Sequence, residues 1–356
     1  MQPIQASNYS IFFNEKGYEA LNIHLKENKY SNIFVIVDTN TNEKCLNNFL
    51  PYIYTDLKIE IIEFENGEIN KNIDTCVEIW KVLTELGGDR KTLIINLGGG
   101  VVTDLGGFVA STFKRGIDFI NVPTTLLAMV DASIGGKNGV DLGNLKNQIG
   151  TITNPKMVII DTDYLETLEQ LEMRSGLAEM LKHGLIADAN YWTKFLDLFM
   201  LDSNNLNELI YDSIIIKNNI VTQDPTENGI RKALNFGHTL GHAIESYFLE
   251  SENKKTLLHG EAIAIGMILE SYISMQKNLI TVIEYQEIKL TINSIFDKIT
   301  FDKNDLEPIL DLLIHDKKNE YGNIQFSLLD GIGKIKINQF VDNEYLNLAF
   351  DDYKIE

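Results

Sequence analysis

Three of the six histidines of this chain lie close together in the sequence. His238 and His242 are four positions apart, so they would share one face of a helix, and His259 follows shortly afterwards. Imidazole nitrogens bind metals and carry protons near neutral pH. Two histidines and a carboxylate, with one position left for substrate, form a common catalytic zinc set. We predict a metal centre here, although helix histidines that only satisfy polar partners would show the same spacing.

The sequence leaves open which carboxylate would complete this centre. Glu179, Glu245 and Glu261 are the candidates, and spacing alone does not say which two histidines would bind the metal. A metalloprotease motif of the form His-Glu-x-x-His is excluded, because Thr239 stands where that motif has its glutamate.

A glycine-rich segment in the first half of the chain indicates a second binding function. Glycines at 98–100 follow an apolar run and precede a helical pattern, so the backbone could approach a ligand and helix N–H groups could bind phosphate. We expect Thr103 and Asp104 to cap this helix. Gly106 and Gly107 exceed what a tight turn requires. The segment favours nucleotide binding, although Thr103 replaces the third glycine of the usual dinucleotide fingerprint.

Other polar residues follow the predicted strands. Asp38 closes the first of them, where it could bind a ribose hydroxyl or form a local turn, and segment 67–71 has the same ambiguity. Segment 122–148 holds adjacent threonines, an aspartate, a Gly-Gly-Lys run and a Lys-Asn pair, which are poor core material. The lysine after two glycines suits an anion, but the spacing is not that of a Walker loop.

The elements that would position these residues divide the chain into two domains. A length of 356 residues exceeds what one hydrophobic core usually supports. Residues 1–162 alternate between β-branched runs and helical patterns such as 73–86, which predicts a Rossmann-like α/β domain with a parallel sheet. The predicted strands are 33–37, 59–62, 92–96, 118–122 and 157–160.

Residues 163–356 show the pattern of an all-α domain, with apolar residues every three or four positions. The predicted helices are 171–187, 191–201, 206–222, 236–248, 260–277 and 282–296, and a small strand pair is expected at 325–328 and 334–337. Ligands of such α/β folds lie at the carboxyl ends of the strands, so we expect the active site in the cleft between the two domains.

Composition excludes several classes of protein. An apolar content of 44% and a charged content of 23% are ordinary for a globular protein, and a net charge of −20 argues against nucleic-acid binding. The apolar runs are too short to span a membrane. Cys45 and Cys76 are too few for a disulfide framework and no secretory signal is visible, so we expect a cytoplasmic protein.

In chain order, these motifs resemble the 3-dehydroquinate synthase family, whose members catalyse the second step of the shikimate pathway. The likeness extends over nearly the whole chain and rests on 98–104, 114–116, 123–125, 131–137, 146–147, 176–182, 231–245, 259–261 and 316–318. It implies an NAD-binding α/β domain, a helical metal-binding domain and a homodimer. Asn138 departs from the family pattern, which often has threonine there, and loop 224–229 is less acidic than usual.

The resemblance implies roles for the metal and substrate residues. It makes Glu179, His238 and His259 the ligands of Zn²⁺, or of Co²⁺ in its place, and leaves His242 to face the substrate. The other residues that it assigns to substrate are Lys182, Lys217 and Asn235 for carboxylate and hydroxyl groups, Lys137, Asn147, Arg231 and one of Lys317 and Lys318 for the phosphate and polar clamp, Asp131 within the same motif as Lys137, and Arg115, which would reach the phosphate across the dimer interface.

For NAD, the resemblance implies contacts from the first domain. The residues that match are Asp38, Glu68, Lys71, Gly99, Gly100, Val101, Asp104, Thr124, Thr125, Lys146 and Thr167.

The reaction implied by the resemblance converts 3-deoxy-D-arabino-heptulosonate 7-phosphate into 3-dehydroquinate and phosphate. It proceeds through transient oxidation by NAD⁺, elimination of phosphate, re-reduction and an intramolecular aldol closure. Because NAD ends unchanged, the enzyme would be a lyase rather than an oxidoreductase.

Three alternatives are compatible with the same motifs. A related sugar phosphate cyclase or a metal-dependent polyol dehydrogenase would share the glycines and the histidines, although a dehydrogenase would not need so many convergent cations. A non-catalytic zinc- or nucleotide-binding relative is disfavoured, because every position that the mechanism needs carries a competent group.

Overall fold

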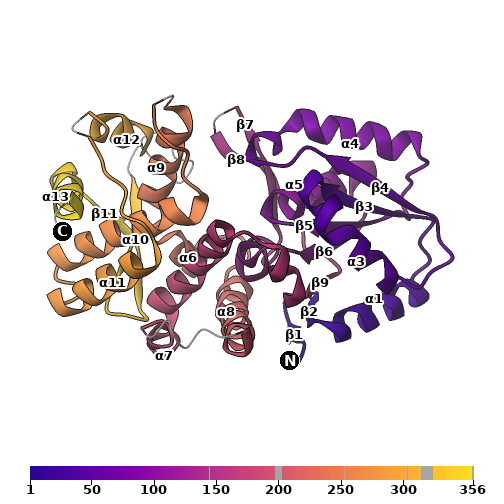
Figure 1. The fold of residues 1–356 in the computed structure, drawn as a ribbon, viewed down its shortest axis with the longest axis horizontal. Helices are drawn as coiled ribbons and strands as arrows, with labels where there is room; N and C mark the ends of the chain where they lie inside the picture. The colour runs from indigo at the N-terminus through magenta and orange to yellow at the C-terminus, as the bar shows by residue number, and fades with distance from the viewer. Residues whose placement is uncertain (144, 197–202, 252, 303, 314–323, 355–356) are drawn as a thin grey trace. The chain divides into compact units, whose positions relative to one another are not determined.

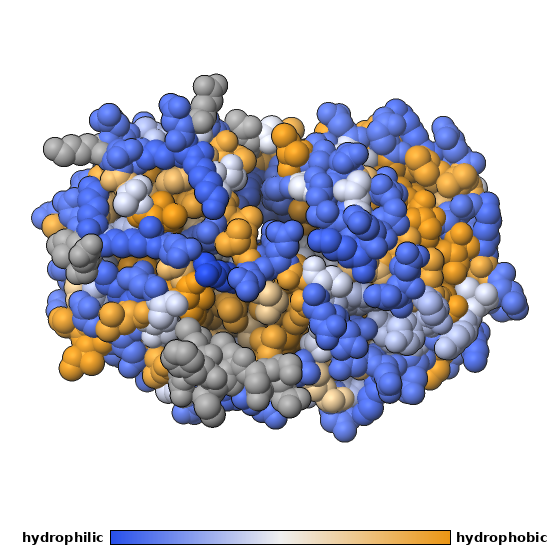
Figure 2. Space-filling view, in the orientation of Figure 1, coloured by the Kyte–Doolittle hydropathy of each residue, from blue (hydrophilic) through white to orange (hydrophobic). Residues whose placement is uncertain are grey.

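The computed structural model describes all residues except 144, 197–202, 252, 303, 314–323 and 355–356. The chain divides into two compact units, Met1–Glu169 and Gln170–Glu356, which Figure 1 colours from indigo and magenta to orange and yellow. Hydrophilic side chains cover much of the visible surface of each unit in Figure 2, in keeping with the acidic composition. Among the described residues, no helix combines the length and hydrophobicity that a membrane span requires.

A seven-stranded sheet forms the centre of the first unit. Its spatial order is β1-β2-β9-β6-β5-β3-β4, and all neighbouring pairs are parallel except β1 with β2. The five predicted strands are confirmed and form five adjacent positions of this sheet. The bounds are β1 Ile4–Gln5, β2 Ser10–Phe13, β3 Ile33–Asp38, β4 Ile59–Phe64, β5 Leu93–Gly98, β6 Asp118–Pro123 and β9 Met157–Ile160.

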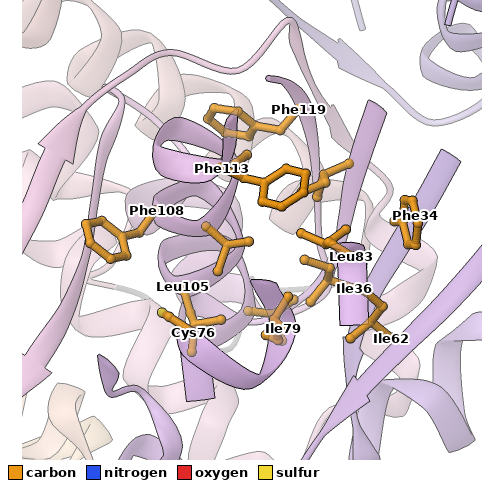
Figure 3. Packing of buried hydrophobic residues seen from close by; sticks show 14 of the residues in the cluster. Phe34, Ile36, Ile62, Cys76, Ile79, Leu83, Leu105, Phe108, Phe113 and Phe119 are labelled. Atoms are coloured by element: carbon orange, nitrogen blue, oxygen red, sulfur yellow. The ribbon is translucent and has the colours of Figure 1, made fainter. Parts of the chain in front are cut away.

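Helices cover the sheet because its central strands are apolar on both faces. Phe34 and Ile36 of β3 pack with Ile79 and Leu83 of the predicted helix, and Figure 3 shows this cluster. Val35, on the opposite face of β3, is also fully buried. Burial of both faces is what a parallel sheet requires. The longer helices of this unit are α1 Glu15–Glu27, α4 Ile73–Glu85 and α5 Gly100–Thr112.

The expected capping of α5 by Thr103 and Asp104 is wrong. The helix begins at Gly100, so that Gly99 is the N-cap residue, and no side chain forms a capping hydrogen bond there. Thr103 Oγ1 instead donates back to the carbonyl oxygen of Gly100 at 3.1 Å, and Asp104 pairs with Lys71. Helix hydrogen bonding thus starts directly after β5, which leaves the first amides of α5 without a side-chain cap.

Gly106 and Gly107 have a packing role rather than a role in a ligand loop. A Cβ atom at Gly106 would lie 2.0 Å from Asn96 Oδ1, and one at Gly107 would lie 2.0 Å from Asn138 Oδ1. Helix α5 can therefore lie close to β5 and to the hairpin formed by β7 (Lys137–Leu142) and β8 (Leu145–Ile152), which the sequence did not predict.

The second unit consists of helices and one strand pair. Its elements are α6 Gln170–Ala187, α7 Ala189–Thr193, α8 Ser203–Gln223, α9 His238–Glu250, α10 His259–Gln276, α11 Val282–Ile295, α12 Leu306–Leu313, β10 Gln325–Leu329, β11 Ile335–Phe340 and α13 Asn343–Lys354. Five of the six predicted helices and the strand pair are confirmed. The prediction of a helix over 191–201 is confirmed to Thr193 and wrong over 194–196, because Lys194 and Phe195 donate to carbonyls three residues back and the helix ends in a turn. The rest of this predicted helix, 197–201, lies outside the described residues.

Helices α9 and α10 meet at two glycines. A Cβ atom at Gly266 of α10 would lie 1.9 Å from the carbonyl oxygen of Gly237, the residue before α9. Gly237 itself adopts a left-handed conformation with φ of 77°, and a Cβ there would lie 2.6 Å from Met267 Cγ. The start of α9 therefore rests directly on the backbone of α10.

Replacing Gly266 by alanine should destabilise the protein. A Gly-to-Ala change inside a helix ordinarily stabilises it by roughly 0.5–1 kcal/mol. Here we expect a loss of about 1–3 kcal/mol, because the added methyl group would overpack the contact between the two helices. Urea denaturation would measure this change. Gly100→Ala is the matched control, since its Cβ would meet only Ala132 Cβ at 3.5 Å; a Gly266→Ala protein as stable as this control would contradict the packing argument.

Candidate metal and nucleotide sites

His238 and His259 occupy equivalent places, because each is the first residue of a helix of the second unit. The start of α9 is fixed by Glu270, a fully buried residue of α10 that sequence reasoning missed. Its carboxylate accepts hydrogen bonds from the amides of Gly237 at 2.7 Å and Leu240 at 3.2 Å. Free amides at a helix N-terminus favour such an anionic partner. Glu270 therefore sets the position from which His238 projects.

The three predicted histidines do come together. Their ring centroids lie 5.2 Å (His238–His242), 5.6 Å (His238–His259) and 5.7 Å (His242–His259) apart. One ring nitrogen from each lies within 4.8 Å of the others, a spacing that a shared metal ion could bridge.

Glu179 supplies the carboxylate that faces this cluster. It lies on α6 and is fully buried, with Oε1 at 3.4 Å from His238 Nε2 and 3.8 Å from His259 Nε2. Ligand atoms about 2 Å from a tetrahedral zinc ion are separated by roughly 3.3 Å, so the distances from Glu179 Oε1 to the two imidazole nitrogens are close to those around one ion. The donor set, one carboxylate oxygen and two imidazole nitrogens, is also one that zinc prefers.

The other two candidate carboxylates are engaged elsewhere. Glu261 Oε2 accepts a hydrogen bond from the amide of Leu258 at 2.8 Å and so caps α10. Glu245 Oε2 lies 3.2 Å from Nδ1 of His259, on the ring edge opposite to Glu179. The geometry therefore favours Glu179 among the three candidates.

Both histidines are also held at their second nitrogen. His238 Nδ1 lies 3.1 Å from the carbonyl oxygen of Phe236, and His259 Nδ1 lies 3.2 Å from Glu245 Oε2. A carbonyl or carboxylate oxygen only accepts, so each Nδ1 must carry the proton. Each Nε2 then turns towards Glu179, as expected for a metal ligand fixed by an outer hydrogen bond.

Electrostatics around Glu179 keep its carboxylate ionised. Burial acts to raise its pKa, but attraction by Lys182, which forms a buried ion pair with it, and by His238 holds the pKa well below its ordinary value. Burial, with Lys182 nearby, lowers the pKa of His238 to about 4. Burial acts to lower the pKa of His259 as well, but attraction by Glu245 and Glu179 outweighs it and raises that pKa to about 9.

The remaining predicted substrate residues of this unit lie on neighbouring elements. Lys217 is buried on α8, and Arg231 and Asn235 lie in the 3₁₀ turn Ile230–Asn235, which packs against α6 and α8. Arg231 Nη1 donates to the carbonyl oxygen of Pro225 at 2.7 Å. Asn235 Nδ2 donates to Glu227 Oε1 at 3.0 Å, a partner that sequence reasoning missed although it lies in the variant loop. Lys317 and Lys318 lie outside the described residues.

In the first unit, the N-terminus of α5 offers a site for phosphate. Gly99, Gly100 and Val101 lie at the carboxyl end of β5, where backbone N–H groups and the helix dipole favour an anion. The amide of Thr124 donates to the carbonyl oxygen of Gly98 at 3.0 Å, and Thr125 lies so close that a Cβ at Gly99 would be 2.9 Å from its Cγ2. These predicted residues are therefore brought together at one edge of the sheet.

A charged cluster lies beside this edge. Lys71 is 4% exposed and its Nζ lies 2.6 Å from Asp104 Oδ2. Burial opposes the charge of Lys71, but attraction by Asp104 and Glu68 outweighs it and raises the pKa of the ammonium group. Glu68 also pairs with Lys146 at 3.6 Å, so four of the predicted cofactor residues form one network.

Asp38 and Thr167 have local partners. Asp38 Oδ1 accepts from the amide of Thr41 at 2.8 Å and from its hydroxyl at 2.9 Å, which is the turn that the sequence offered as the alternative to ribose binding. Thr167 Oγ1 donates to the carbonyl oxygen of Tyr164 at 2.8 Å. The contacts of Asp38 use only Oδ1. These local hydrogen bonds account for the positions of Asp38 and Thr167 without a ligand.

Four predicted substrate residues lie in the first unit. Lys137 is exposed at the start of β7, and Asn147 lies in β8 with its amide bonded to Asp141 Oδ1 at 2.6 Å. Asp131 ends up in the π-helical turn Ala128–Ala132. Arg115 is exposed in a turn, with φ of 72°. Of the two family departures, Asn138 ties the base of the hairpin through the carbonyls of Gly136 and Thr153, each at 2.9 Å.

Comparison with solved structures supports this architecture. The chain aligns over 99% of its length with 99% of a 2-deoxy-scyllo-inosose synthase complexed with carbaglucose-6-phosphate, NAD⁺ and Co²⁺, with a TM-score of 0.87 and 26% identity. A 2-epi-5-epi-valiolone synthase from Streptomyces hygroscopicus subsp. jinggangensis 5008 has the same fold (TM-score 0.82, 24% identity, 99% and 98% of the two chains). A probable glycerol dehydrogenase from Sinorhizobium meliloti 1021 is a more distant match in fold (TM-score 0.62, 14% identity, 99% and 98%).

Sequence comparison identifies the family. Residues 61–175 match the family described as 3-dehydroquinate synthase N-terminal, and residues 176–319 match 3-dehydroquinate synthase C-terminal. The chain is 42% identical over 329 residues to the 3-dehydroquinate synthase of Parabacteroides distasonis, covering 92% of each chain. It is 40% identical over 291 residues to that of Lactococcus lactis subsp. cremoris, covering 81% of each. The resemblance is confirmed, and this chain belongs to the 3-dehydroquinate synthase family.

Proposed function

We propose that this protein is a 3-dehydroquinate synthase that converts 3-deoxy-D-arabino-heptulosonate 7-phosphate into 3-dehydroquinate and phosphate. The observation that carries the proposal is the convergence of Glu179 Oε1 on the Nε2 atoms of His238 and His259, at 3.4 and 3.8 Å, in a chain that matches both parts of this family. The reaction belongs to the shikimate pathway, which leads to chorismate and the aromatic amino acids.

The donor sets of the two units fit the two cofactors that the reaction needs. Glu179, His238 and His259 would hold a divalent metal, Zn²⁺ or Co²⁺, and the start of α5 with Lys71 and Asp104 would hold NAD. When bound, the metal would polarise the substrate hydroxyl that is oxidised, and NAD⁺ would take up and later return a hydride. The likeness to the inosose synthase complex, which holds NAD⁺ and Co²⁺, supports this pairing.

The protein itself would bind and orient a substrate that carries both a carboxylate and a phosphate. Lys182, Lys217 and Arg231 are 1%, 5% and 2% exposed, so their charges lie in surroundings where an anion is bound strongly. We assign Lys182, Lys217 and Asn235 to the carboxylate and hydroxyl groups. Arg231 can hold phosphate through a bidentate contact that a lysine cannot make.

The residues of the first unit would complete this site. We assign Lys137 and Asn147 to the phosphate end of the substrate, with Asp131 nearby in the same motif and one of Lys317 and Lys318 as a further cation. A homodimer, in which Arg115 reaches the phosphate of the partner's substrate, and an active site between the two domains stay predictions. A cytoplasmic location is likewise our expectation from the two cysteines.

His242 would face the substrate as a proton carrier. It lies in the same cluster as the two histidines that we propose as metal ligands, at 5.2 and 5.7 Å between ring centroids, and it is half-buried. An imidazole so placed can hold a proton near the atoms that react and return it as the charge develops.

The competing proposal is a metal-dependent polyol dehydrogenase, because glycerol dehydrogenases share the fold. The two proposals differ in net chemistry. A synthase should release one phosphate per substrate without accumulating NADH, since its NAD ends unchanged. Incubation of the protein with NAD⁺, zinc and the heptulosonate phosphate would measure both products. Accumulation of NADH with glycerol, and no phosphate from the heptulosonate, would overturn the proposed function and favour the dehydrogenase.

Paired alanine substitutions would separate the roles of the histidines. His259→Ala should lose tight zinc binding and turnover together, because a ligand is removed. His242→Ala should keep its zinc and lose turnover by about 100-fold or more, the usual contribution of a general acid–base group. Zinc content by atomic absorption and phosphate release would be measured on the same samples. Loss of zinc from the His242→Ala protein would instead make His242 a ligand.

Metal binding should release a proton from His259. Its pKa of about 9 in the metal-free site means that it is protonated at pH 7, whereas His238, with a pKa of about 4, is already neutral. A metal ligand must be deprotonated, so we expect about one proton released per zinc at pH 7 and an apparent affinity that rises with pH until it levels off near the pKa of His259. Calorimetry in buffers of different ionisation enthalpy would count the protons. Zinc binding without proton release would show that His259 is neutral beforehand.

A further inference from the structure

We propose that Glu245 is a positioning residue of the metal centre, whose carboxylate holds Nδ1 of His259 so that Nε2 is presented to the ion. The inference rests on the proposed metal site and goes further by assigning a residue that does not itself touch metal or substrate. It follows from the side chains around the two histidines and does not depend on the identity of the substrate.

Geometry places Glu245 behind His259 rather than beside the ion. Glu245 Oε2 lies 3.2 Å from His259 Nδ1, whereas Glu179 Oε1 approaches Nε2 of the same ring at 3.8 Å. The two nitrogens point from different edges of the imidazole, so a carboxylate bonded to Nδ1 is directed away from an ion bound to Nε2. A hydrogen bond of this kind fixes both the tautomer and the plane of the ring.

The helix pattern explains how Glu245 reaches this place. It lies seven residues after His238, two turns along the same face of α9, and it is 6% exposed. Helix α9 therefore supplies one metal ligand and the carboxylate that orients the other. Helix α10 does the reverse, since it carries His259 and also Glu270, which holds the amides at the start of α9. The two helices position each other's histidine.

The two histidines differ in the charge of their outer partner. His238 donates to a backbone carbonyl, while His259 donates to a carboxylate. An ionised acceptor makes the stronger hydrogen bond and increases the electron density at the ligating nitrogen. Glu245 should therefore strengthen metal binding at His259 specifically. No side-chain substitution can remove the equivalent partner of His238, which makes Glu245 the position at which this effect can be tested.

The test is the zinc affinity of a Glu245→Gln protein, measured by competition with a chromogenic chelator. Glutamine keeps the size of the side chain and removes its charge. Loss of an outer-shell partner typically weakens metal binding by about 10- to 100-fold, and we expect a loss in this range. Glu250→Gln, at the exposed end of the same helix, is the matched control and should bind zinc like the parent protein. NAD affinity should be unchanged in both variants.

A Glu245→Gln affinity within twofold of the parent would overturn the inference while leaving the metal site intact. A parent protein that binds no zinc would instead defeat the proposed function, so the two failures are distinguishable. A second measurement, on the parent protein, tests the proposal even if the Glu245→Gln protein does not fold. Long-range ¹H–¹⁵N correlation spectra of the zinc-loaded parent protein should show the His259 proton on Nδ1, and a proton on Nε2 would reject the proposal.

Discussion

An ionised carboxylate with no solvent exposure is the constraint on which the second unit depends. Glu179 is fully buried, and moving such a charge out of water costs several kcal/mol unless other charges and dipoles replace the solvent. Here Lys182 and the imidazoles of His238 and His259 replace it. Helices α6, α9 and α10 must therefore lie close enough to deliver these groups to one point. The small residues and the positions of the helix starts in this region allow the three helices to approach one another that closely.

The contact between α9 and α10 shows how the constraint is met. Gly237 and Gly266 let one backbone rest on the other, and Glu270 replaces the missing side-chain cap of α9. Because both histidines are the first residues of their helices, the position of each helix start decides where each imidazole lies. A shift of one helix along the other would separate His238 from His259. The same packing interaction thus stabilises the unit and sets the geometry of the candidate metal centre.

In the first unit, the question is how an acidic chain could bind anionic ligands. The chain carries a net charge of −20, yet its proposed ligands are anions. Backbone amides at the start of α5 provide positive potential without using a lysine or arginine, and the lysine beside them, Lys71, is kept charged by Asp104 and Glu68. Binding of phosphate would then depend on local dipoles and paired charges, which act over a few ångströms, rather than on the overall charge of the protein.

Much of the fold and of the site was determined by the sequence alone. Runs of β-branched residues identified the five predicted strands and a parallel sheet, and β3 and β5 are apolar because strands at the centre of such a sheet are buried on both faces. The spacing of His238 and His242, which places both on one face of a helix, and the nearby His259 indicated the cluster. Family resemblance supplied the roles that spacing left open.

Only the tertiary structure shows where each carboxylate lies and which groups it contacts. By spacing alone Glu179, Glu245 and Glu261 were equivalent candidates, the family resemblance favoured Glu179, and Glu270 was not among them. Their contacts depend on which atoms meet across α6, α9 and α10, and contacts between distant segments leave no periodic signal in the chain. The same holds for Gly106 and Gly107, whose close approach to Asn96 and Asn138 requires knowing which strand each helix faces. Local patterns specify elements, whereas the partners of a buried charge are fixed only when those elements pack.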